Sequence, residues 1–212
     1  MPGAWEFRKS VFVAILTREV LTASWAFALK QLIIPPGGNI RWSSGAPFDH
    51  ARNELCRSAL REGYDYVFFL DDDVLAPPYA IVNLMARNLP IISGMYFRRN
   101  PPHAPVAQIV NKDGMPRWLD EFKIGELVEV CHVGAGCLLI QRNVFDKIGY
   151  PWFEWLCDRY DLPVPQRTSE DFTFCRKAKD AGYKIIVDTS VQCIHAGLSA
   201  SSIEGMKALG IG

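Results

Sequence analysis

Apolar runs alternate with segments of helical spacing along the first hundred residues of the chain. The runs have the length and composition of strands buried on both faces of a sheet, and they lie within residues 10–16, 66–70 and 90–97. A shorter strand is expected at 40–43. Apolar residues recur every three or four positions in the intervening segments 20–32, 48–61 and 77–87. This order predicts an α/β fold with a central sheet covered by helices.

The second half of the chain has shorter elements. A hairpin is expected where segments 106–110 and 116–119 flank Asn111-Lys112-Asp113-Gly114, which is rich in turn residues. Further strands are expected at 127–133, 136–140 and 184–188. Helices are expected at 143–148 and 170–181, and Gly182 follows the second of them. Because hairpins follow the alternating strands and helices, we expect a mixed sheet.

The composition is that of an ordinary globular domain. Of the 212 residues, 49% are apolar and 22% are charged. We expect one domain over residues 1–212, with short tails at 1–9 and 198–212. The 23 Lys and Arg residues balance the 23 Asp and Glu residues, so no overall field favours nucleic acid as a partner.

The chain has no feature of a targeting or membrane-spanning segment. No apolar run reaches the ~20 residues that span a bilayer, and the run at 11–16 is too short for a signal peptide. The six cysteines form no C-x-x-C pair, so we expect reduced thiols rather than a zinc site. These features predict a cytoplasmic protein without a transmembrane segment.

Three consecutive carboxylates, Asp71, Asp72 and Asp73, follow the apolar run at 66–70. Open α/β sheets bind their ligands at the carboxyl ends of strands. Adjacent carboxylates repel one another, and a hard divalent cation relieves that repulsion. Because alternate residues of a strand point the same way, Asp71 and Asp73 are expected to converge on one ion while Asp72 faces elsewhere. The alternative is a solvated acidic turn before a helix.

Five separated motifs together resemble GT-A-fold glycosyltransferases of the family 2 type. Phe69-Leu70-Asp71-Asp72-Asp73 resembles their D-x-D motif. The others follow the family's order and are Ala51-Arg52-Asn53, Gly134-Ala135-Gly136-Cys137-Leu138-Leu139-Ile140, Ser169-Glu170-Asp171 and His195-Ala196-Gly197. The resemblance covers roughly residues 11–197. It implies a GT-A fold with a mixed central sheet flanked by helices, and transfer of a sugar from a UDP- or GDP-linked donor to a sugar, lipid-linked or protein acceptor.

The resemblance also implies that Mn²⁺ or Mg²⁺ bridges the donor phosphates. Asp73 is expected to bind the metal directly, Asp71 to bind the metal or the ribose, and Asp72 to touch the ribose or the donor sugar. His195 follows a predicted strand and is expected to be a further metal ligand. Its ring nitrogen suits Mn²⁺ better than Mg²⁺. A packed or solvated histidine is the alternative for His195.

Glu170 and Asp171 lie at the start of the helix predicted at 170–181. Acids in a first turn favour the helix dipole, and Thr168 or Ser169 is a suitable N-cap, so a capping role explains both acids without chemistry. The resemblance implies instead that Asp171 is the general base toward the acceptor hydroxyl in an inverting transfer. It further implies that Glu170 contacts the acceptor or the donor sugar.

Further donor contacts are expected from the helix at 48–61 and from the end of the first strand. Arg52 is expected to reach the diphosphate or to orient an Asp, because a guanidinium matches both phosphate and carboxylate geometry. Asn53 lies beside Arg52 in the same motif, and the resemblance implies that it also contributes to donor binding. Thr17 and Glu19 occupy the positions at which the family binds the nucleoside. A solvated Arg52 is the alternative.

The segment Tyr150-Pro151-Trp152-Phe153-Glu154-Trp155 is rich in aromatic residues and has few helix signals. Flat aromatic rings suit the apolar faces of sugars, so we expect Trp152 and Trp155 to contact the acceptor. The same residues are also suited to cover the sheet or to touch a membrane surface. Gly134 and Gly136 permit a close backbone approach, either to the sugars or in a plain bulge.

Two other functions fit part of the pattern. Asp71-x-Asp73 at a strand end also resembles the motif of haloacid-dehalogenase-type phosphatases, in which the first Asp is the nucleophile. Here the motif lies seventy residues into the chain, and Glu170-Asp171 follows no apolar strand. The second alternative is a nucleotide-sugar-binding module without activity. The intact set of Asp71, Asp73, Asp171 and His195 favours an enzyme.

Overall fold

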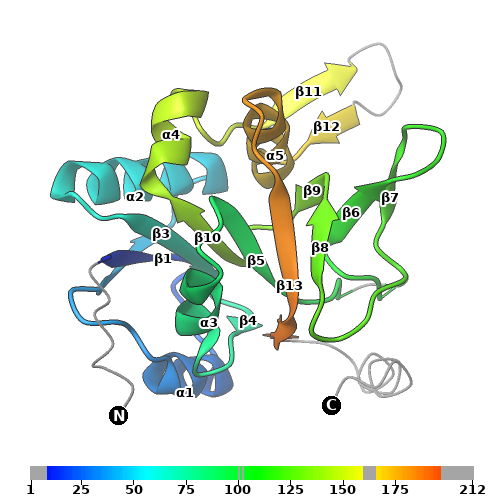
Figure 1. The fold of residues 1–212 in the computed structure, drawn as a ribbon. Coiled ribbons are helices and arrows are strands. Elements are labelled where there is room, and N and C mark those ends of the chain that lie inside the picture. Colours follow the sequence, from blue (N-terminus) through cyan, green and yellow to red (C-terminus); the bar gives the residue numbers. More distant parts are fainter. Residues whose placement is uncertain (1–8, 100, 102, 160–165, 197–212) are drawn as a thin grey trace.

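A seven-stranded mixed sheet forms the centre of the molecule (Figure 1). The computed structural model describes residues 9–99, 101, 103–159 and 166–196. In spatial order the strands are β2 (Asn39–Ser44), β1 (Val11–Thr17), β3 (Tyr66–Asp71), β10 (Cys137–Gln141), β5 (Ile91–Met95), β13 (Ile185–Gln192) and β8 (Leu127–Val130). β1 runs parallel to both β2 and β3, and β5 runs parallel to β13. β10 is antiparallel to β3 and β5, and β8 is antiparallel to β13, so the predicted mixed sheet is confirmed.

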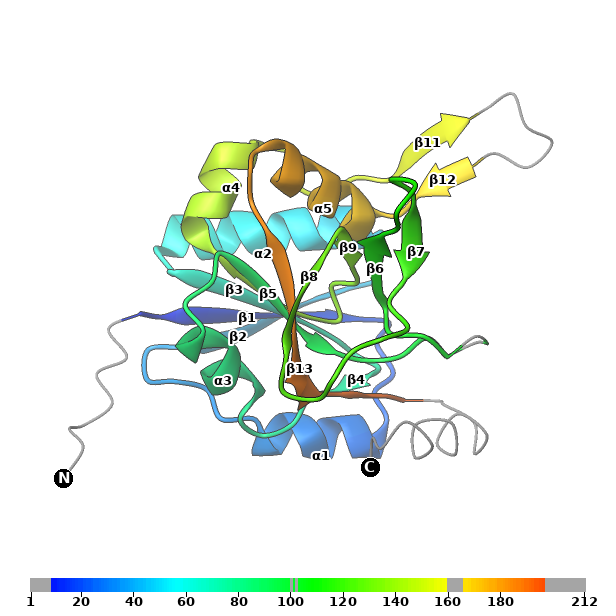
Figure 2. The same cartoon turned by 45° about the vertical axis from the view of Figure 1, so that its right-hand side comes forward.

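Helices cover both faces of this sheet (Figures 1 and 2). α2 (Phe48–Glu62), α4 (Arg142–Ile148) and α5 (Glu170–Asp180) lie on one face, and α1 (Ala23–Gln31) and α3 (Ala80–Ala86) on the other. The inner strands β1 and β3 are almost entirely apolar because they contribute to two cores. In β1, Phe12 and Ala14 belong to the core under α2, α4 and α5, whereas Val13 and Ile15 belong to the core over α1 and α3.

The segment after β3 sets up the functional region. A turn at Asp72 and Asp73 leads into β4 (Val74–Leu75), which pairs antiparallel with β14 (Ile194–His195). In this register Val74 is opposite His195. The parallel pairing of β1 with β3 places Leu16 beside Asp71. The ends of β1 and β3 and the last described residues of the chain therefore meet at one edge of the sheet.

Two smaller sheets extend the fold. β6 (Ala107–Val110) pairs with β7 (Pro116–Trp118), which confirms the predicted hairpin, and also with β9 (His132–Val133). The single strand expected at 127–133 is divided, because a bend at Cys131 moves the chain from β8 in the central sheet to β9 in the smaller one. β11 (Leu156–Arg159) and β12 (Gln166–Thr168) form a hairpin that the sequence pattern did not predict.

Two helices begin later than expected. α1 begins at Ala23 because Thr22 is its N-cap and accepts a hydrogen bond from the Trp25 N–H. α3 begins at Ala80, since Pro77 and Pro78 lie before the helix and Ala80 N closes a turn on Pro77 O. Within the described residues, no helix combines the length and the apolar character that a membrane span requires.

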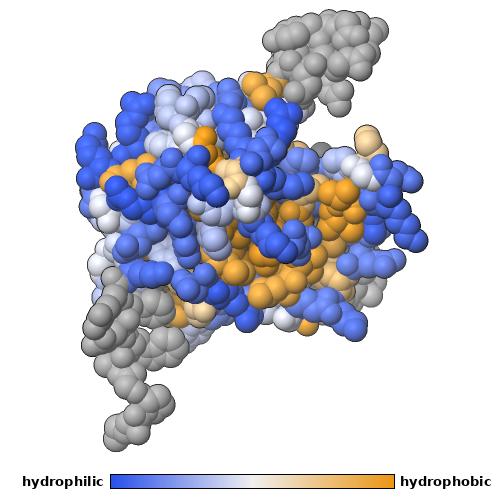
Figure 3. Space-filling view, turned by 45° about the horizontal axis from the view of Figure 1, so that its top comes forward, coloured by the Kyte–Doolittle hydropathy of each residue, from blue (hydrophilic) through white to orange (hydrophobic). Residues whose placement is uncertain are grey.

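The surface and the thiols agree with the composition. The face in Figure 3 is largely polar, with one area where apolar residues gather. Cys56, Cys131, Cys137, Cys175 and Cys193 are free thiols and are buried, as predicted. The side chain of Cys157 lies outside the described part of the chain.

Candidate functional site

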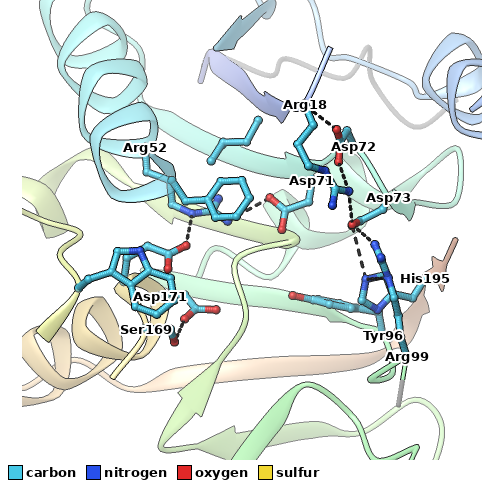
Figure 4. Close-up of a pocket in the computed structure, with 14 residues that line it drawn as sticks. Arg18, Arg52, Asp71, Asp72, Asp73, Tyr96, Arg99, Ser169, Asp171 and His195 are labelled. Carbon is cyan, nitrogen blue, oxygen red and sulfur yellow. Dashed lines mark hydrogen bonds and ion pairs between the residues drawn. The ribbon is translucent and has the colours of Figure 1, made fainter. Parts of the chain in front are cut away.

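A cavity of about 360 Å³ lies at the sheet edge where β1, β3 and β14 meet (Figure 4). It is bounded by groups of both charges and by aromatic rings. Its lining residues are Leu16, Arg18, Phe48, Arg52, Asp71, Asp72, Asp73, Tyr96, Arg99, Trp155, Ser169, Glu170, Asp171 and His195. The fold therefore brings together all three predicted acids of the triplet, both acids of α5, Arg52 and His195.

The three acids of the triplet point to different partners. β3 ends at Asp71, and the turn at the next two residues breaks the alternation of a strand. Asp71 Oδ1 accepts a hydrogen bond from Arg52 Nη2 at 3.0 Å, whereas Asp73 lies beside His195. The expectation that Asp71 and Asp73 converge because they share one face of a strand was wrong in its reason, since Asp73 lies in the turn.

Asp72 fixes the end of β1. Its Oδ2 accepts a hydrogen bond from the backbone N–H of Arg18 at 2.8 Å, and its Oδ1 accepts one from Arg18 Nη2 at 3.0 Å. Asp72 is buried, so these two bonds replace the hydration of its carboxylate. The segment that follows β1 is thereby attached to the acidic turn.

Asp73 and His195 form the most compact pair of potential metal ligands. Asp73 Oδ1 lies 3.5 Å from His195 Nε2. The other ring nitrogen, Nδ1, lies 2.8 Å from the backbone carbonyl of Phe97, which fixes the ring orientation and directs Nε2 toward Asp73. Metal-binding histidines use such a carbonyl partner in the same way. The donor set at this position therefore fits a divalent cation.

Two arginines also contact Asp73 (Figure 4). Arg99 Nη2 and Arg18 Nη2 both donate to Asp73 Oδ2, the latter at 2.9 Å. Arg99 Nε donates to His195 Nε2 at 3.1 Å. Burial by itself would raise the pKa of Asp73, but the contact with His195 and the charges of Arg99 and Arg18 outweigh it, so this pKa is lowered. Asp73 is therefore a carboxylate at neutral pH.

Arg52 connects the two sides of the cavity. The residue is 3% exposed, its Nε donates to Glu170 Oε1 at 3.2 Å, and its Nη2 donates to Asp71. Its guanidinium lies 5.1 Å from the centre of the Phe69 ring, a favourable cation–π distance. Burial lowers the pKa of Arg52, but the charges of Asp71 and Glu170 more than offset this and raise it. The Nη1 atom is buried and has no hydrogen-bond partner.

Glu170 and Asp171 open α5 and face the cavity. Burial raises the pKa of Glu170, although Arg52 opposes this. Burial also raises the pKa of Asp171, against the hydrogen bond from Ser169 and the charge of Arg52. Ser169 is the N-cap residue by its backbone, yet its hydroxyl makes no capping bond and donates to Asp171 Oδ1. Asp171 Oδ1 also accepts from Phe172 N at 2.8 Å.

Asn53 is one of the predicted site residues that the structure places elsewhere. It does not line the cavity, and it is buried behind Arg52. Its Nδ2 donates to Phe153 O at 2.7 Å, and its Oδ1 accepts from the backbone N–H groups of Trp152 and Phe153, both at 3.1 Å. The expectation of a donor contact is corrected, because the amide of Asn53 is engaged in holding the 152–153 backbone.

The two tryptophans of the aromatic segment also differ. Trp152 is buried, and its Nε1 donates to Phe145 O at 2.9 Å, so it belongs to the core. Trp155 is 48% exposed and lines the cavity. Of the two tryptophans, only Trp155 reaches the cavity.

Thr17 and Glu19 line a second, larger cavity of about 620 Å³. This cavity lies between α1 and the strands β1 and β2, and Trp25 and Trp42 contribute to its apolar wall. It is separate from the carboxylate cavity because alternate residues of β1 face opposite sides of the sheet, and Leu16 lines the first cavity. The structure therefore does not bring Thr17 and Glu19 together with the acids.

The space beside Gly134 and Gly136 is occupied by a side chain of the protein itself. A Cβ at Gly136 would lie 2.9 Å from the ring and hydroxyl of Tyr96, and Tyr96 also blocks a side chain at Gly134. The Tyr96 hydroxyl accepts a hydrogen bond from Gly136 N at 2.9 Å. The close backbone approach that these glycines predict is thus made by Tyr96.

Sequence reasoning missed Arg18, Tyr96 and Arg99, and it considered Ser169 only as part of a motif and as an N-cap. Arg18 had a usable signal, because it lies two residues after the strand predicted at 10–16 and so near the sheet edge that carries the acids. Arg99 had none, since it lies in an irregular segment after β5 and reaches the acids only through the fold.

Comparison with known proteins gives the fold. No family model and no curated protein matches the sequence. Among solved structures, A197 from STIV is similar with a TM-score of 0.60 and 19% identity, over 88% of this chain and 85% of A197. The structure of GalNAc-T7 with UDP, GalNAc and Mn²⁺ is similar with a TM-score of 0.61 and 12% identity. That match covers 89% of this chain but only 44% of GalNAc-T7. These similarities show that the chain has the fold of GT-A glycosyltransferases.

Proposed function

We propose that the protein is a metal-dependent glycosyltransferase that moves a sugar from a nucleotide-diphosphate sugar to an acceptor hydroxyl with inversion. The observation that carries this proposal is the content of one cavity. Asp73 and His195 lie on its β4–β14 side, and Asp171 lies on its α5 side. A cation-binding pair and a basic carboxylate thus share a space at the ligand-binding edge of a GT-A sheet.

Asp73 and His195 would hold the metal, which we infer to be Mn²⁺ or Mg²⁺. The described residues contain no group of three His, Cys, Asp or Glu side chains placed to hold a metal ion. The donor diphosphate and Asp71 are therefore proposed to complete the coordination. A bound cation supplies Lewis-acid stabilisation of the departing diphosphate.

The donor is proposed to lie between Arg52 and the acidic turn. The place of Arg52 in the cavity lining supports this, because a guanidinium matches the charge and geometry of phosphate oxygens. The donor is proposed to be a UDP- or GDP-linked sugar, since these charged groups address the diphosphate that both donors share. Asp72 is proposed to contact the ribose or donor sugar, Glu170 a sugar hydroxyl, and Thr17 and Glu19 the nucleoside, which would have to reach the second cavity.

Asp171 is proposed to act as the general base. The acceptor oxygen would form a bond to the anomeric carbon while its proton moves to the Asp171 carboxylate. The bond from the anomeric carbon to the diphosphate oxygen would break, and the diphosphate would leave with the electron pair. A raised pKa makes Asp171 a better proton acceptor in this step. The proposed acceptor is a sugar, a lipid-linked molecule or a protein, all of which present hydroxyl groups.

Asp73→Ala tests the metal site. This variant is expected to lose metal-dependent nucleotide affinity by at least about 100-fold, because even partners behind a metal ligand contribute about 10–100-fold. Calorimetric titration with UDP and GDP, in Mn²⁺ and in EDTA, measures the effect. Asp146→Ala removes an exposed acid from α4 and serves as the matched control. Unchanged Mn²⁺-dependent affinity in Asp73→Ala would refute the proposed metal site.

Trp155→Ala tests the acceptor side. The variant is expected to raise the acceptor KM roughly 2–10-fold and to leave the donor KM unchanged, because an aromatic contact contributes about 0.5–1.5 kcal/mol. Trp152→Ala is the comparison. It is expected to lower the free energy of unfolding by about 3–5 kcal/mol, since Trp152 is buried. Equal acceptor KM values in wild type and Trp155→Ala would show that Trp155 only covers the sheet and does not contact the acceptor.

A further inference from the structure

We propose that Arg99 is an internal counter-ion of the metal site. In the absence of a cation its guanidinium holds Asp73 and His195, and when the cation binds, the guanidinium moves to the donor diphosphate. The inference rests on the proposed function, and it adds a reason why metal and nucleotide should bind together. It also gives a role to a residue that no sequence motif contains.

Arg99 and a metal ion need the same atoms. Arg99 Nη2 donates to Asp73 Oδ2, and Arg99 Nε donates to His195 Nε2 at 3.1 Å. Because His195 Nδ1 faces the carbonyl of Phe97, Nε2 carries the lone pair that a metal would use. The hydrogen bond from Arg99 occupies that lone pair. The guanidinium and the metal therefore exclude each other at His195.

Arg99 is the arginine that would move, and Arg18 would remain. Arg18 also donates to Asp73, but Asp72 holds both its guanidinium and its backbone N–H. A cation on Asp73 and His195 would take both of these partners from Arg99 and would repel its charge. The Arg99 side chain is 37% exposed, which leaves room for a rotamer change within the cavity wall.

A nucleoside diphosphate would favour the displaced state. Its phosphates bring negative charge beside the guanidinium, whose fork geometry matches phosphate oxygens. The same phosphates supply metal ligands that the described part of the protein lacks, as no three-residue group is present there. Metal binding alone must displace Arg99 without compensation, whereas metal and diphosphate together replace every contact that is lost. The two ligands should therefore bind with positive cooperativity.

Mn²⁺ titrations of the full chain test this exchange. The signal of free Mn²⁺ in electron paramagnetic resonance gives the metal affinity of wild type and Arg99→Gln, each with and without UDP or GDP. Without nucleotide, Arg99→Gln is expected to bind Mn²⁺ about tenfold more tightly than wild type, because the competing guanidinium is gone. Addition of nucleotide should raise the Mn²⁺ affinity of both proteins, and this increase is expected to be smaller in Arg99→Gln than in wild type.

Arg98→Gln is the matched control. It removes the same charge one residue away, where the guanidinium lies 4.6 Å from the centre of the Trp118 ring and away from the cavity lining. A similar rise in Mn²⁺ affinity in both variants would mean a general charge effect and would overturn the proposal. Mn²⁺ binding to Arg99→Gln that is no tighter than to wild type would overturn it as well.

The remaining outcomes separate this inference from the proposed function. Metal-dependent nucleotide binding in wild type, together with an unchanged Arg99→Gln, would remove the counter-ion role and leave the transferase. Nucleotide binding that is equal in Mn²⁺ and EDTA and is lost in Arg99→Gln would make Arg99 a permanent substitute for a cation, which also overturns the exchange. No binding of Mn²⁺ or nucleotide by any of the proteins would refute both.

Discussion

Asp171→Asn is expected to lower the rate of sugar transfer by about 10²–10⁴-fold while donor and metal binding stay normal. General-base catalysis contributes this factor, which corresponds to roughly 3–5 kcal/mol of the barrier. The substitution keeps the shape of the side chain, and the amide oxygen can still accept the hydrogen bond from Phe172 N that the carboxylate accepts at 2.8 Å. A role in capping the helix would therefore survive the change, and a role as base would not.

Measurement of initial rates and of the product's anomeric configuration checks this prediction. Asp180→Asn, an exposed acid at the other end of α5, is the control for charge on the same helix. Near-normal turnover by Asp171→Asn would reduce Asp171 to a capping residue. Retention of configuration in the product, read by NMR, would contradict the single displacement. A retaining enzyme needs no base at this position, so the assignment of Asp171 would fall as well.

The raised pKa of Asp171 adds an independent stability readout. Folding makes ionisation of this carboxyl harder, so the folded state loses relative stability as the pH rises through the raised pKa. Asparagine has no such cost. Asp171→Asn should unfold at a higher temperature than wild type at pH 7, and the difference should vanish below the ordinary Asp pKa of about 3.9. A stabilised but inactive variant would identify Asp171 as a functional rather than a structural acid.

Elements with a strong local pattern were predictable, and long-range contacts were not. The apolar run at 66–70 became β3 because its residues supply both cores of the sheet, and such a run can only be buried. The division of 127–133 into β8 and β9 depends on the pairing of β9 with β6, in which Ala107 is opposite Val133. No period within the segment carries that information, so one strand was the natural expectation.

Within the site, the positions of single residues also depend on long-range contacts that the local sequence does not reveal. Trp152 and Trp155 occur in one aromatic segment, and their composition gives no reason to separate them. The hydrogen bonds of Asn53 to the 152–153 backbone turn Trp152 inward, and this contact joins residues about a hundred positions apart. Acids and histidines are recognisable because few other residues bind cations, whereas an arginine such as Arg99 has many ordinary roles on a surface.

Arg52→Gln is expected to lower the free energy of unfolding by about 3–5 kcal/mol. Removal of one partner from a buried ion pair leaves the other charge without compensation. Here the side chain of Arg52 is 4% exposed, and its loss would leave Glu170, at 6%, buried without a counter-charge and Asp71, at 28%, partly so. Urea unfolding followed by circular dichroism measures the change, provided that the slope with denaturant stays constant.

Two further variants assign this loss to the ion pairs. Arg57→Gln removes an exposed arginine of the same helix, which pairs with Glu54 at 3.3 Å, and surface pairs of this kind contribute only about 0–1 kcal/mol. The double variant Arg52→Gln/Glu170→Gln should be more stable than Arg52→Gln alone. The second substitution removes the charge of Glu170, the more buried of the two carboxylates that lose their counter-charge. The coupling energy between the two positions is expected to be about 0.5–3 kcal/mol. A coupling near zero would mean that the ion pair with Glu170 does not account for the loss, and that the ion pair with Asp71 and the cation–π contact with the Phe69 ring carry it.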